Sequence, residues 1–456
     1  MLPTHAGNAV PHPAVHLAWT WPGPSRFRSM DRLPGRAALS RSERSRRLEA
    51  NYVMQFAFLL NVQARFGRTV RYVVQSLAMA AGLALLNAAA QAQAVAPPTA
   101  PRVLRAAPVQ EGPGPSPPQT SGARPVGQPS SADDAARYLA GMPVPPGSPL
   151  AGLTRNPRWV AHANAMDAAF SRLDQRELSK IRDWQAEFLA PVTRAGRTCL
   201  YFFSGPDFLH ADAFYPGCST YILVSLEPVE SIPQIQSLPP DALENSLQNL
   251  EMSLNTFLQV GYFETKELRT YSQRSSFRGI LPIMFVFLAR SGKHISSVDY
   301  NTALGGNRGV KISFVDSATG VHKVLYYISA DLSDEGLKRN SGLLHFCSHF
   351  GPANSFLKAA SYLLHGNGFD LARNYLMQAS ASILQDDSGI PLRSFSPDKW
   401  TLRFFGAYNG PIDLFKNYYQ PDLRQYYATS APQPLAFNFG YQWNPKNALL
   451  ILAVRR

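Results

Sequence analysis

Helical spacing of apolar residues is the clearest pattern in the second half of the chain. Between residues 157 and 190, large apolar side chains recur three and four positions apart, which places them on one face of an α-helix. A second such face covers 240–258, which Pro240 and Asp241 introduce as a typical helix start. Further helices are expected at 280–289, 334–348, 353–365, 369–384 and 411–427.

Two short runs are instead apolar on both faces. They occupy 199–203 and 220–226, and each ends at a turn signal that contains proline. Continuous apolar runs of this length favour strands buried inside a parallel sheet. A helix-like stretch at 208–215 lies between them, so the three segments together predict a compact βαβ unit.

Several shorter strands are expected after this unit. Residues 310–315 and 321–328 read as a β-hairpin, and strands follow at 400–405, 435–441 and 448–454. Strands that alternate with helices, followed by several strands near the C-terminus, predict an α/β fold. We expect a mixed sheet with a Rossmann-like first βαβ unit, flanking helices and a β-rich C-terminal tail.

Residues 65–94 have the pattern of a bacterial export signal. Arg65, Arg68 and Arg71 precede an apolar core at 72–86, and Ala-Gln-Ala at 90–92 forms a small-x-small cleavage site. The core is shorter than the roughly 20 apolar residues that a membrane span needs. The segment predicts a cleaved signal peptide and a periplasmic or secreted protein. The alternative is an uncleaved inner-membrane anchor through 72–90.

The remaining chain divides by composition. An export signal normally begins a chain, so we interpret residues 1–64 either as a translation start placed too early or as a disordered extension. Residues 95–155 contain 14 of the 37 prolines among many Ala, Gly and Ser residues, which predicts an extended, disordered linker. Residues 156–456 contain no second proline-rich break, and we expect a single α/β domain there.

The positive charge of the chain is unevenly distributed. The net charge is +13, from 44 Lys and Arg against 31 Asp and Glu, a balance that can indicate nucleic-acid binding. More than half of the excess precedes residue 95, because 11 of the basic but only three of the acidic residues lie there. The other Lys and Arg form no run that would neutralise phosphates. We therefore expect no nucleic-acid partner, and membrane contact only through an uncleaved signal segment.

Three cysteines follow the signal segment. Cys199 and Cys218 stand near the starts of the two predicted neighbouring strands, where equivalent positions lie about 5 Å apart. That distance is within the reach of a disulfide, which an oxidising periplasm would maintain. The sequence thus allows a Cys199–Cys218 bond, although buried unpaired cysteines are also common. Cys347 is expected to be a buried thiol.

The ends of these two strands carry the most suggestive polar residues. In a nucleotide-binding βαβ unit, a Gly-containing turn follows the first strand and an acidic residue ends the second. Asp207 and Glu227 occupy these places, which gives the unit a likeness to a methyltransferase-like Rossmann fold. The turn holds only one Gly, however, and Pro206 restricts it, so its amides are poorly suited to hold a phosphate. The simpler interpretation is a tight turn in which Asp207 caps the next helix.

Two other groups are weaker candidates. His345 and His349 are four residues apart on a predicted helix and could bind a metal ion with His365 as a third ligand, but no Glu completes a His-Glu-x-x-His pattern. Ordinary histidines are the simpler interpretation. Asp386 adjoins a second carboxylate and could belong to an active site. Its Asp-Ser-Gly context at 387–389 is, however, typical of a structural turn.

Several segments together resemble an uncharacterised family of exported bacterial proteins. They include Phe203-Ser-Gly-Pro-Asp-Phe208, the strand end Leu226-Glu-Pro228, and Ile-Leu-Gln-Asp-Asp-Ser-Gly-Ile-Pro at 383–391. The likeness covers about residues 157–456 and implies an exported α/β protein. It implies no activity and assigns no functional residue.

The sequence contains no assembled catalytic motif. Neither a Gly-x-Ser-x-Gly elbow nor a defensible pairing of a catalytic Cys with a His is present. We predict a binding protein without a cofactor, whose partner is an unknown small molecule or a component of the cell envelope. The alternative is an enzyme, a Rossmann-like transferase or hydrolase, with its site at the C-terminal ends of the first two strands. Asp207 and Glu227 would serve that site, with His210 or Asp386 as further candidates.

Overall fold

The computed structural model describes residues 131–456, apart from 194–196, 264–267, 269–274, 301 and 303. These residues belong to one compact unit of the chain. The predictions for residues 1–64, for the signal segment at 65–94 and for the first part of the linker, 95–130, lie outside the described residues. Among the helices of the described part, none combines the length and the apolar character that crossing a membrane would require.

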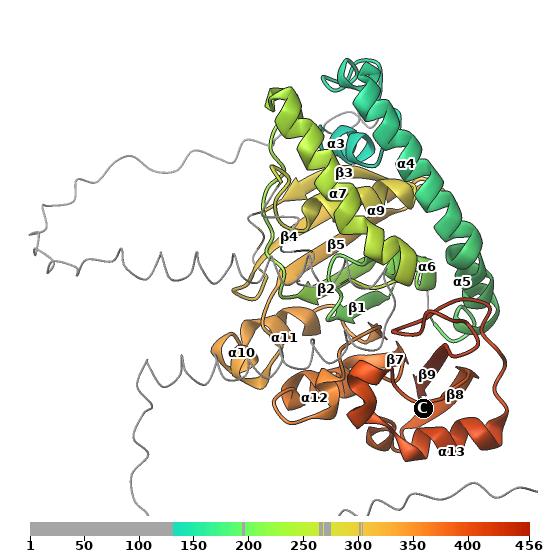
Figure 1. Ribbon diagram of the computed structural model, residues 1–456. Coiled ribbons are helices and arrows are strands. Elements are labelled where there is room, and N and C mark those ends of the chain that lie inside the picture. Colours follow the sequence, from blue (N-terminus) through green and yellow to red (C-terminus); the bar gives the residue numbers. More distant parts are fainter. Residues whose placement is uncertain (1–130, 194–196, 264–267, 269–274, 301, 303) are drawn as a thin grey trace, which may run out of the picture. The chain divides into compact units, whose positions relative to one another are not determined.

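A nine-stranded mixed sheet runs through this unit in the order β3-β4-β5-β2-β1-β6-β7-β9-β8 (Figure 1). The five strands β5, β2, β1, β6 and β7 are parallel neighbours. β4 is antiparallel to both of its neighbours, and so is β9. The expected α/β fold with a mixed sheet is thus confirmed. The strands are β1 Thr198–Phe202, β2 Thr220–Ser225, β3 Lys293–Asp299, β4 Arg308–Asp316, β5 His322–Ser329, β6 Ala353–Leu357, β7 Ser380–Gln385, β8 Trp400–Gly406 and β9 Leu449–Arg455.

Helices pack on both faces of the sheet (Figure 1). Because successive side chains of a strand point to opposite faces, Tyr201 and Leu223 join one hydrophobic cluster while Phe202 and Val224 join another. The first cluster includes α3 Ser131–Leu139, α4 Pro157–Leu173, α5 Ser179–Trp184, α6 Phe208–Phe214, α7 Pro240–Val260 and α9 Leu281–Arg290. The second includes α10 Asp334–Arg339, α11 Gly342–Ser348 and α12 Asp370–Ala379, and α13 Pro421–Ser430 belongs to a third, smaller cluster.

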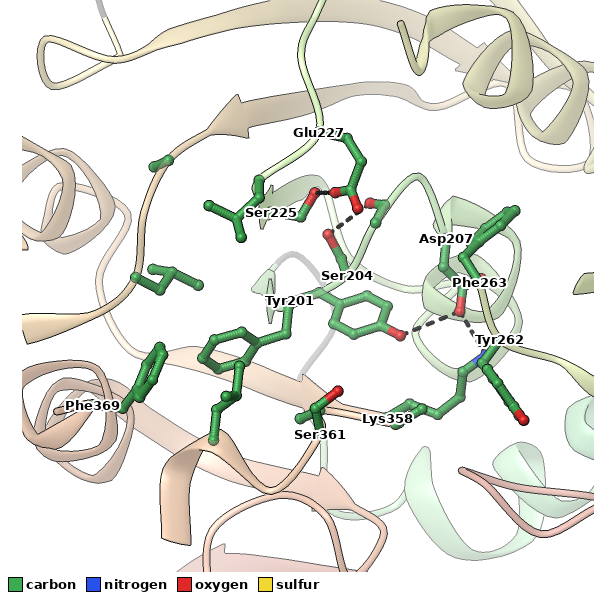
Figure 2. Close-up of a pocket in the computed structure, with 18 of the residues that line it drawn as sticks. Tyr201, Ser204, Asp207, Ser225, Glu227, Tyr262, Phe263, Lys358, Ser361 and Phe369 are labelled. Carbon is green, nitrogen blue, oxygen red and sulfur yellow. Dashed lines mark hydrogen bonds and ion pairs between the residues drawn. The ribbon is translucent and has the colours of Figure 1, made fainter. Parts of the chain in front are cut away.

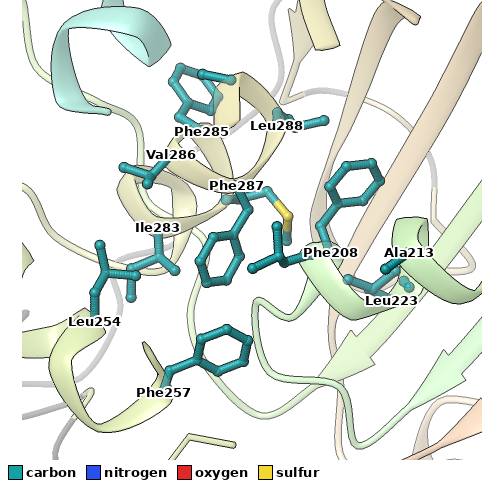
Figure 3. Packing of buried hydrophobic residues seen from close by; sticks show 14 of the residues in the cluster. Phe208, Ala213, Leu223, Leu254, Phe257, Ile283, Phe285, Val286, Phe287 and Leu288 are labelled. Atoms are coloured by element: carbon teal, nitrogen blue, oxygen red, sulfur yellow. The ribbon is translucent and has the colours of Figure 1, made fainter. Parts of the chain in front are cut away.

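The larger of the two main clusters is centred on α9, which is buried almost all round, as its apolar sequence predicts (Figure 3). Phe287 of α9 lies with its ring centroid 4.9 Å from that of Phe257 on α7. On the sheet side, Phe208 at the start of α6 meets the ring of Phe314 on β4 at 5.7 Å. Close packing of this kind fixes α6, and with it the turn that joins β1 to α6.

The predicted helices at 353–365 and 369–384 are wrong in part. Residues 353–357 form the central strand β6, and α12 ends at Ala379, where β7 begins. Both strands bury polar side chains that satisfy one another: Ser382 donates to Asn354 Oδ1 at 2.9 Å, and the hydroxyls of Ser355 and Ser380 are 2.6 Å apart. The spacing of apolar residues, which predicted helices here, does not reveal hydrogen bonds between segments that are distant in the sequence.

The C-terminal prediction is also corrected in detail. Residues 435–441 form no strand, although Leu435, Phe437 and Phe439 are buried in the core; one isolated bridge joins Phe439 to Gln442. The edge strand β3 was not predicted, because only two of its seven side chains are buried. The helical piece expected at 411–427 is divided into a 3₁₀ segment, Asp413–Tyr418, and the helix α13.

The folded unit begins earlier than predicted. Residues 131–155 were assigned to the disordered linker, but 131–139 form α3, whose Tyr138 and Leu139 are buried. The ring of Tyr138 stacks on Trp159 at 5.6 Å, and Asp133 Oδ1 accepts a hydrogen bond from the Ile295 amide at 2.8 Å. Proline content predicted the linker, whereas this helix lies in its longest proline-free stretch, residues 130–142.

Candidate functional site

A pocket of about 190 Å³ opens at the carboxyl ends of four neighbouring parallel strands, β5, β2, β1 and β6 (Figure 2). The predicted residues Asp207 and Glu227 both line this pocket, so the structure brings them together. Lys358, directly after β6, and Asp331, shortly after β5, line it as well. The pocket therefore collects one charged residue from behind each of the four strands.

Asp207 has two roles in the structure. Its Oδ1 accepts a hydrogen bond from the backbone N–H of His210 at 3.1 Å, which confirms the predicted helix cap at the start of α6. Its Oδ2 meets the ammonium of Lys358 at 2.6 Å and accepts a hydrogen bond from the Tyr201 hydroxyl at 3.2 Å. A carboxylate that is only 2% exposed thus links the cap to the pocket wall.

A buried charge cluster, consisting of Glu177, Asp207, His210 and Lys358, lies at one side of the pocket. His210 does not line the pocket, but its two ring nitrogens lie 2.9 Å from Asp207 Oδ1 and 2.9 Å from Glu177 Oε1. Lys358 donates a further hydrogen bond to the backbone oxygen of Gly261 at 2.5 Å. All four side chains of the cluster are nearly inaccessible to solvent.

The ionisation states in this cluster follow from competition between burial and charge. Burial disfavours the charged form of Asp207, but the positive charges of His210 and Lys358 outweigh it and hold the pKa of Asp207 far below its usual value. Burial would lower the pKa of His210, yet Asp207 and Glu177 together raise it. His210 in turn lowers the pKa of Glu177 against the effect of burial. The charged forms of Asp207 and Glu177 are therefore both favoured, and Lys358 Nζ also lies 2.8 Å from His210 Nδ1.

Glu227 is oriented by the two strands that meet beside it. The hydroxyl of Ser225, at the end of β2, donates a hydrogen bond to the Glu227 carboxylate and lies 2.6 Å from the hydroxyl of Tyr327 on β5. Tyr327 also donates to the Glu227 backbone oxygen at 3.0 Å. Ser225 and Glu227 both line the pocket, so an acidic and a hydroxyl side chain stand together on its wall (Figure 2).

The backbone around the pocket is strained. Phe203, after β1, and Ala359 and Ser361, after β6, adopt left-handed conformations with φ of 61°, 51° and 54°. Such a conformation costs a residue with a side chain roughly 1 kcal/mol or more. All three residues line the pocket. Strained backbone persists where function or dense packing requires it, so its concentration here marks the pocket as a candidate site.

Asp386 does not line the pocket and lies behind its wall instead. Its Oδ2 accepts a hydrogen bond from the backbone N–H of Ala359 at 3.2 Å. Burial raises the pKa of Asp386 to about 6, and burial together with the charge of Asp386 raises the pKa of Asp387 to about 7. Asp386 thus joins the site through the backbone of a lining residue.

The predicted metal ligands do not assemble into a metal site. His345 lies on α11 and His349 directly follows its last residue; the two rings adjoin, and His349 Nδ1 donates a hydrogen bond to the backbone oxygen of His345 at 2.8 Å. His365 contacts the backbone oxygen of Asp387 at 3.1 Å instead. Across the residues that the structure describes, no group of three or more His, Cys, Asp or Glu side chains could hold a metal ion.

The predicted register of the cysteines is wrong. Cys199 on β1 lies opposite Tyr221 on β2, whereas Cys218 precedes β2 by two residues. Both are free buried thiols in the structure, as is Cys347, so the Cys199–Cys218 disulfide is not formed. The two thiols are nevertheless close, and burial together with Cys218 raises the pKa of Cys199 well above its usual value.

Sequence reasoning missed three charged residues of the site. Lys358 follows a strand that was predicted as a helix, and Asp331 follows the hairpin strand without any motif around it. Glu177 lies in a helical region whose backbone widens into a π-helical turn, Asp174–Leu178. Such turns are often found at functional sites, but apolar spacing does not reveal them. The signal that identified Asp207 and Glu227, an apolar run before the charged residue, is missing at Lys358, because Asn354 and Ser355 interrupt β6.

Comparison of the chain with models of protein families, with curated proteins and with solved structures finds no match in any of the three. The resemblance to an uncharacterised exported family therefore stays a prediction. The function has to be argued from the geometry of the pocket and from the chemistry of the residues around it.

Proposed function

We propose that the pocket binds a small molecule that carries hydroxyl groups and no phosphate, and that this binding is the role of the protein. The observation that carries the proposal is the position of the pocket in the sheet. With β9 set aside, the parallel strands from β5 to β8 stand in the order 3-2-1-4-5-6, and the pocket lies where this order reverses, between β1 and β6. Ligands of open α/β sheets bind outside the carboxyl ends of the strands at such a reversal.

The charges around the pocket favour a neutral or cationic ligand. Asp207, Glu227 and Asp331 contribute carboxylates, and among the described lining residues only Lys358 contributes a positive charge. That ammonium is already paired with Asp207. A phosphate would therefore meet more negative than positive charge, while Pro206 keeps the turn after β1 from offering a row of free amides. Both features argue against a dinucleotide or another phosphorylated cofactor.

Glu227 supports recognition of hydroxyl groups. In Rossmann-like sheets, an acidic residue at the end of the second strand accepts hydrogen bonds from ribose hydroxyls, and Glu227 holds that place. An apolar ring of the ligand would lie against Phe203 and Phe369, whose ring centroids are 5.9 Å apart. The cavity is smaller than the sites of drug-sized ligands, which fits a nucleoside or a monosaccharide.

Calorimetric titration tests the ligand class. Adenosine and methyl β-D-glucopyranoside serve as the two neutral probes, and ATP serves as the anionic control. We expect at least one neutral probe to bind, and we expect ATP to bind about ten-fold more weakly than adenosine because of the carboxylates. The proposal is contradicted by ATP binding more tightly than both neutral probes, or by neither neutral probe binding at millimolar concentration.

A pair of variants locates the binding site. Glu227→Gln keeps the shape of the side chain and removes its charge, so the dissociation constant of the bound probe should rise about ten-fold at an unchanged melting temperature. Glu335→Gln is the matched control, because Glu335 is an exposed carboxylate on α10 outside the pocket. An equal effect of both variants would place binding elsewhere.

The same proposal includes a location in the periplasm or outside the cell. It is supported by the export pattern at residues 65–94, and such a compartment supplies hydroxyl-rich molecules but few nucleotide cofactors. Deleting residues 65–94 should leave the protein in the cytoplasm, which fractionation would reveal. Unchanged fractionation would refute the location, and full-length protein in the membrane fraction would favour the inner-membrane anchor.

An enzyme, as a Rossmann-like transferase or hydrolase, is the second candidate. It is favoured by the buried charge cluster, because catalytic sites gather groups with displaced pKa values and strained backbone. Incubation of the protein with each bound probe, followed by NMR of the small molecule, separates the two candidates. A new product that Asp207→Asn and Glu227→Gln variants no longer form would establish an enzyme. Recovery of the unchanged probe would leave binding as the function.

A further inference from the structure

The turn that follows β6 is held by side chains from distant parts of the chain. We call residues 359–362 the β6 turn; its first three residues line the pocket. Each of these three backbone N–H groups donates a hydrogen bond to a different side chain. The bonds run from Ala359 to Asp386 Oδ2 at 3.2 Å, from Ala360 to Ser388 Oγ at 2.7 Å, and from Ser361 to the Tyr441 hydroxyl at 3.2 Å.

Two further bonds close the β6 turn. The Tyr441 hydroxyl donates to the backbone oxygen of Ala359 at 2.8 Å, and the Tyr362 hydroxyl donates to Asp387 Oδ2 at 2.7 Å. Ala359, Ser361 and Tyr362 all have left-handed φ values, from 51° to 56°. Such a run of unfavourable conformations persists only where the surroundings over-determine it. Here the constraint comes from the side chains of Asp386, Ser388 and Tyr441, which accept hydrogen bonds from three successive backbone amides.

The acceptors are themselves fixed in place. Ser388 donates to Asp386 Oδ1 through its hydroxyl at 2.6 Å and through its backbone N–H at 3.2 Å. Gly440 leaves the space that the carboxylate fills, because a Cβ at this position would stand only 1.8 Å from Asp386 Oδ2. Asp386 and Ser388 are buried and do not line the pocket, so they reach a ligand only through the β6 turn.

We propose that Asp386 and Ser388 are positioning residues, which set the affinity for the ligand by holding the β6 turn in its left-handed form. The inference rests on the proposed function, because it takes the pocket as the ligand site. It also gives a role to the Asp-Asp-Ser-Gly segment, which a structural turn alone does not explain. A turn at 386–389 could form without Asp386 accepting a hydrogen bond from the backbone N–H of Ala359, which follows a different strand, β6.

Affinity should then depend on pH, because an ionised Asp386 accepts three hydrogen bonds and a protonated one offers fewer acceptor sites. Burial raises the pKa of Asp386 to about 6, while Lys358 favours its charged form. The neighbouring carboxyl of Asp387 also titrates. The other titratable groups around Asp386 and Asp387 are His365 and the phenols of Tyr201, Tyr362, Tyr408, Tyr427 and Tyr441. These phenols stay neutral at the relevant pH, so binding should weaken as the pH falls through 6.

Amide hydrogen exchange of the free protein tests the positioning role without any ligand. Ser388→Ala removes the acceptor of the Ala360 amide, whose exchange should become about ten-fold faster. Ser382→Ala is the matched control: Ser382 is an equally buried serine of β7 that donates to Asn354 and does not touch the β6 turn. An Ala360 amide that exchanges equally fast in both variants and in the wild type would overturn the proposal.

A second variant covers the case in which Ser388→Ala does not fold. Tyr441→Phe keeps the ring and removes the hydroxyl that accepts from the Ser361 amide. Exchange at Ser361 should then rise about ten-fold while the amides of β7 keep their protection. A uniform increase over the whole sheet would instead indicate general destabilisation and would contradict a specific hold on the turn.

Ligand titration completes the test, with adenosine or the glucoside as the probe that binds. Ser388→Ala should weaken binding about ten-fold and Ser382→Ala less than two-fold. Affinity of the wild type should fall between pH 7 and pH 5, and Asp386→Asn should remove the part of this fall near pH 6; a pH profile identical to that of the wild type would overturn the role of Asp386. If neither probe binds the wild type, the proposed function fails, and the exchange experiment alone still decides whether these residues hold the turn.

Discussion

Lys358 is the single side chain on which the electrostatics of the pocket depend most. Its ammonium compensates a carboxylate, Asp207, that is 2% exposed, and it is itself 4% exposed. Removing one member of a buried pair leaves an uncompensated charge in a medium that solvates it poorly. Replacing Lys358 should therefore lower the free energy of unfolding far more than replacing an exposed lysine.

Lys358→Met should lower the free energy of unfolding by about 3–5 kcal/mol, measured by urea denaturation. Lys416→Met is the control, because Lys416 is exposed, and it should change stability by less than about 0.5 kcal/mol. Adding Asp207→Asn to Lys358→Met should recover part of the loss, since the orphaned charge is then gone. Independent, additive losses in the double variant would contradict the pairing.

Asp387→Asn should stabilise the protein increasingly as the pH rises. Burial and the charge of Asp386 raise the pKa of Asp387 in the folded state to about 7, whereas the unfolded chain releases this proton near pH 4. The stability that Asp387 contributes is thus complete below pH 4 and is lost as the pH rises through 7. The asparagine oxygen can still accept the Tyr362 hydroxyl. The stability gained over the wild type should grow by about 2–3 kcal/mol between pH 5 and pH 8 in urea titrations.

The control for this titration is Asp398→Asn, a change at an exposed carboxylate. Its effect should stay near zero at both pH values. A gap between Asp387→Asn and the wild type that does not change with pH would show that Asp387 is not held protonated in the fold.

At the scale of residues, the sequence predicted the part of the site that follows from strand ends. Asp207 and Glu227 were found because each follows a buried apolar run, and parallel strands bring their ends together. The candidates His210 and Asp386 do not line the pocket, and they contact it through the packing of α6 and through the β6 turn. The left-handed backbone at Phe203 and Ala359 could not be predicted, because both are residue types that normally avoid it.

Among the elements, the backbone geometry at the end of α13 predicts how a substitution there changes the free energy of unfolding. The helix ends at Ala431, which caps it in a left-handed conformation with φ of 41°. Glycine is the usual residue at this place because it has no Cβ to be strained. An alanine at this position therefore makes the protein less stable than a glycine would.

Ala431→Gly should raise the free energy of unfolding by about 0.5–1 kcal/mol, because it relieves the left-handed cap. Ala428→Gly is the matched change within the same helix, at an exposed position with ordinary helical geometry. It should lower stability by about 1 kcal/mol. Thermal or urea unfolding of the two variants should thus give shifts of opposite sign; shifts of the same sign would contradict the assigned cap.

Elements with a clear periodicity were predicted well, and those held by distant partners were not. The helix at 240–258 is observed as α7, and the two apolar runs are observed as β1 and β2. β6 was missed because its five residues include two polar ones, whose burial makes sense only beside β7. β7 was missed because it continues directly from α12, without the glycine or proline that usually separates elements.

At the scale of the whole described unit, α3 is the first element and belongs to the hydrophobic core. A chain that starts at residue 131 keeps the burial of Tyr138 and Leu139, whereas a chain that starts at 156 loses it. Burying two such side chains contributes about 3–6 kcal/mol. The shorter chain should therefore melt at a clearly lower temperature, and the longer one should match the full-length protein. Equal melting temperatures for both truncations would show that α3 is not part of the cooperative unit.

The order of the strands could not be predicted from the sequence. Apolar runs identify strands one at a time, but pairing between β1 and β6 joins residues about 155 positions apart along the chain. β9 pairs between β7 and β8 although it is the last strand to appear. Such long-range pairings depend on how well the faces of the sheet pack against the helices, and the local sequence pattern does not reveal this.

The insertion of β9 has a consequence for how the protein is made. Strand β7 gains its second neighbour only from residues 449–455, and the acceptor for the Ser361 amide comes only with residue 441. During synthesis, the wall of the pocket therefore stays unfinished until residue 441 and the strand at 449–455 have been translated. A product that terminates before residue 441 would lack the acceptor for the Ser361 amide and would leave β7 as an open sheet edge, which is prone to pair with other chains.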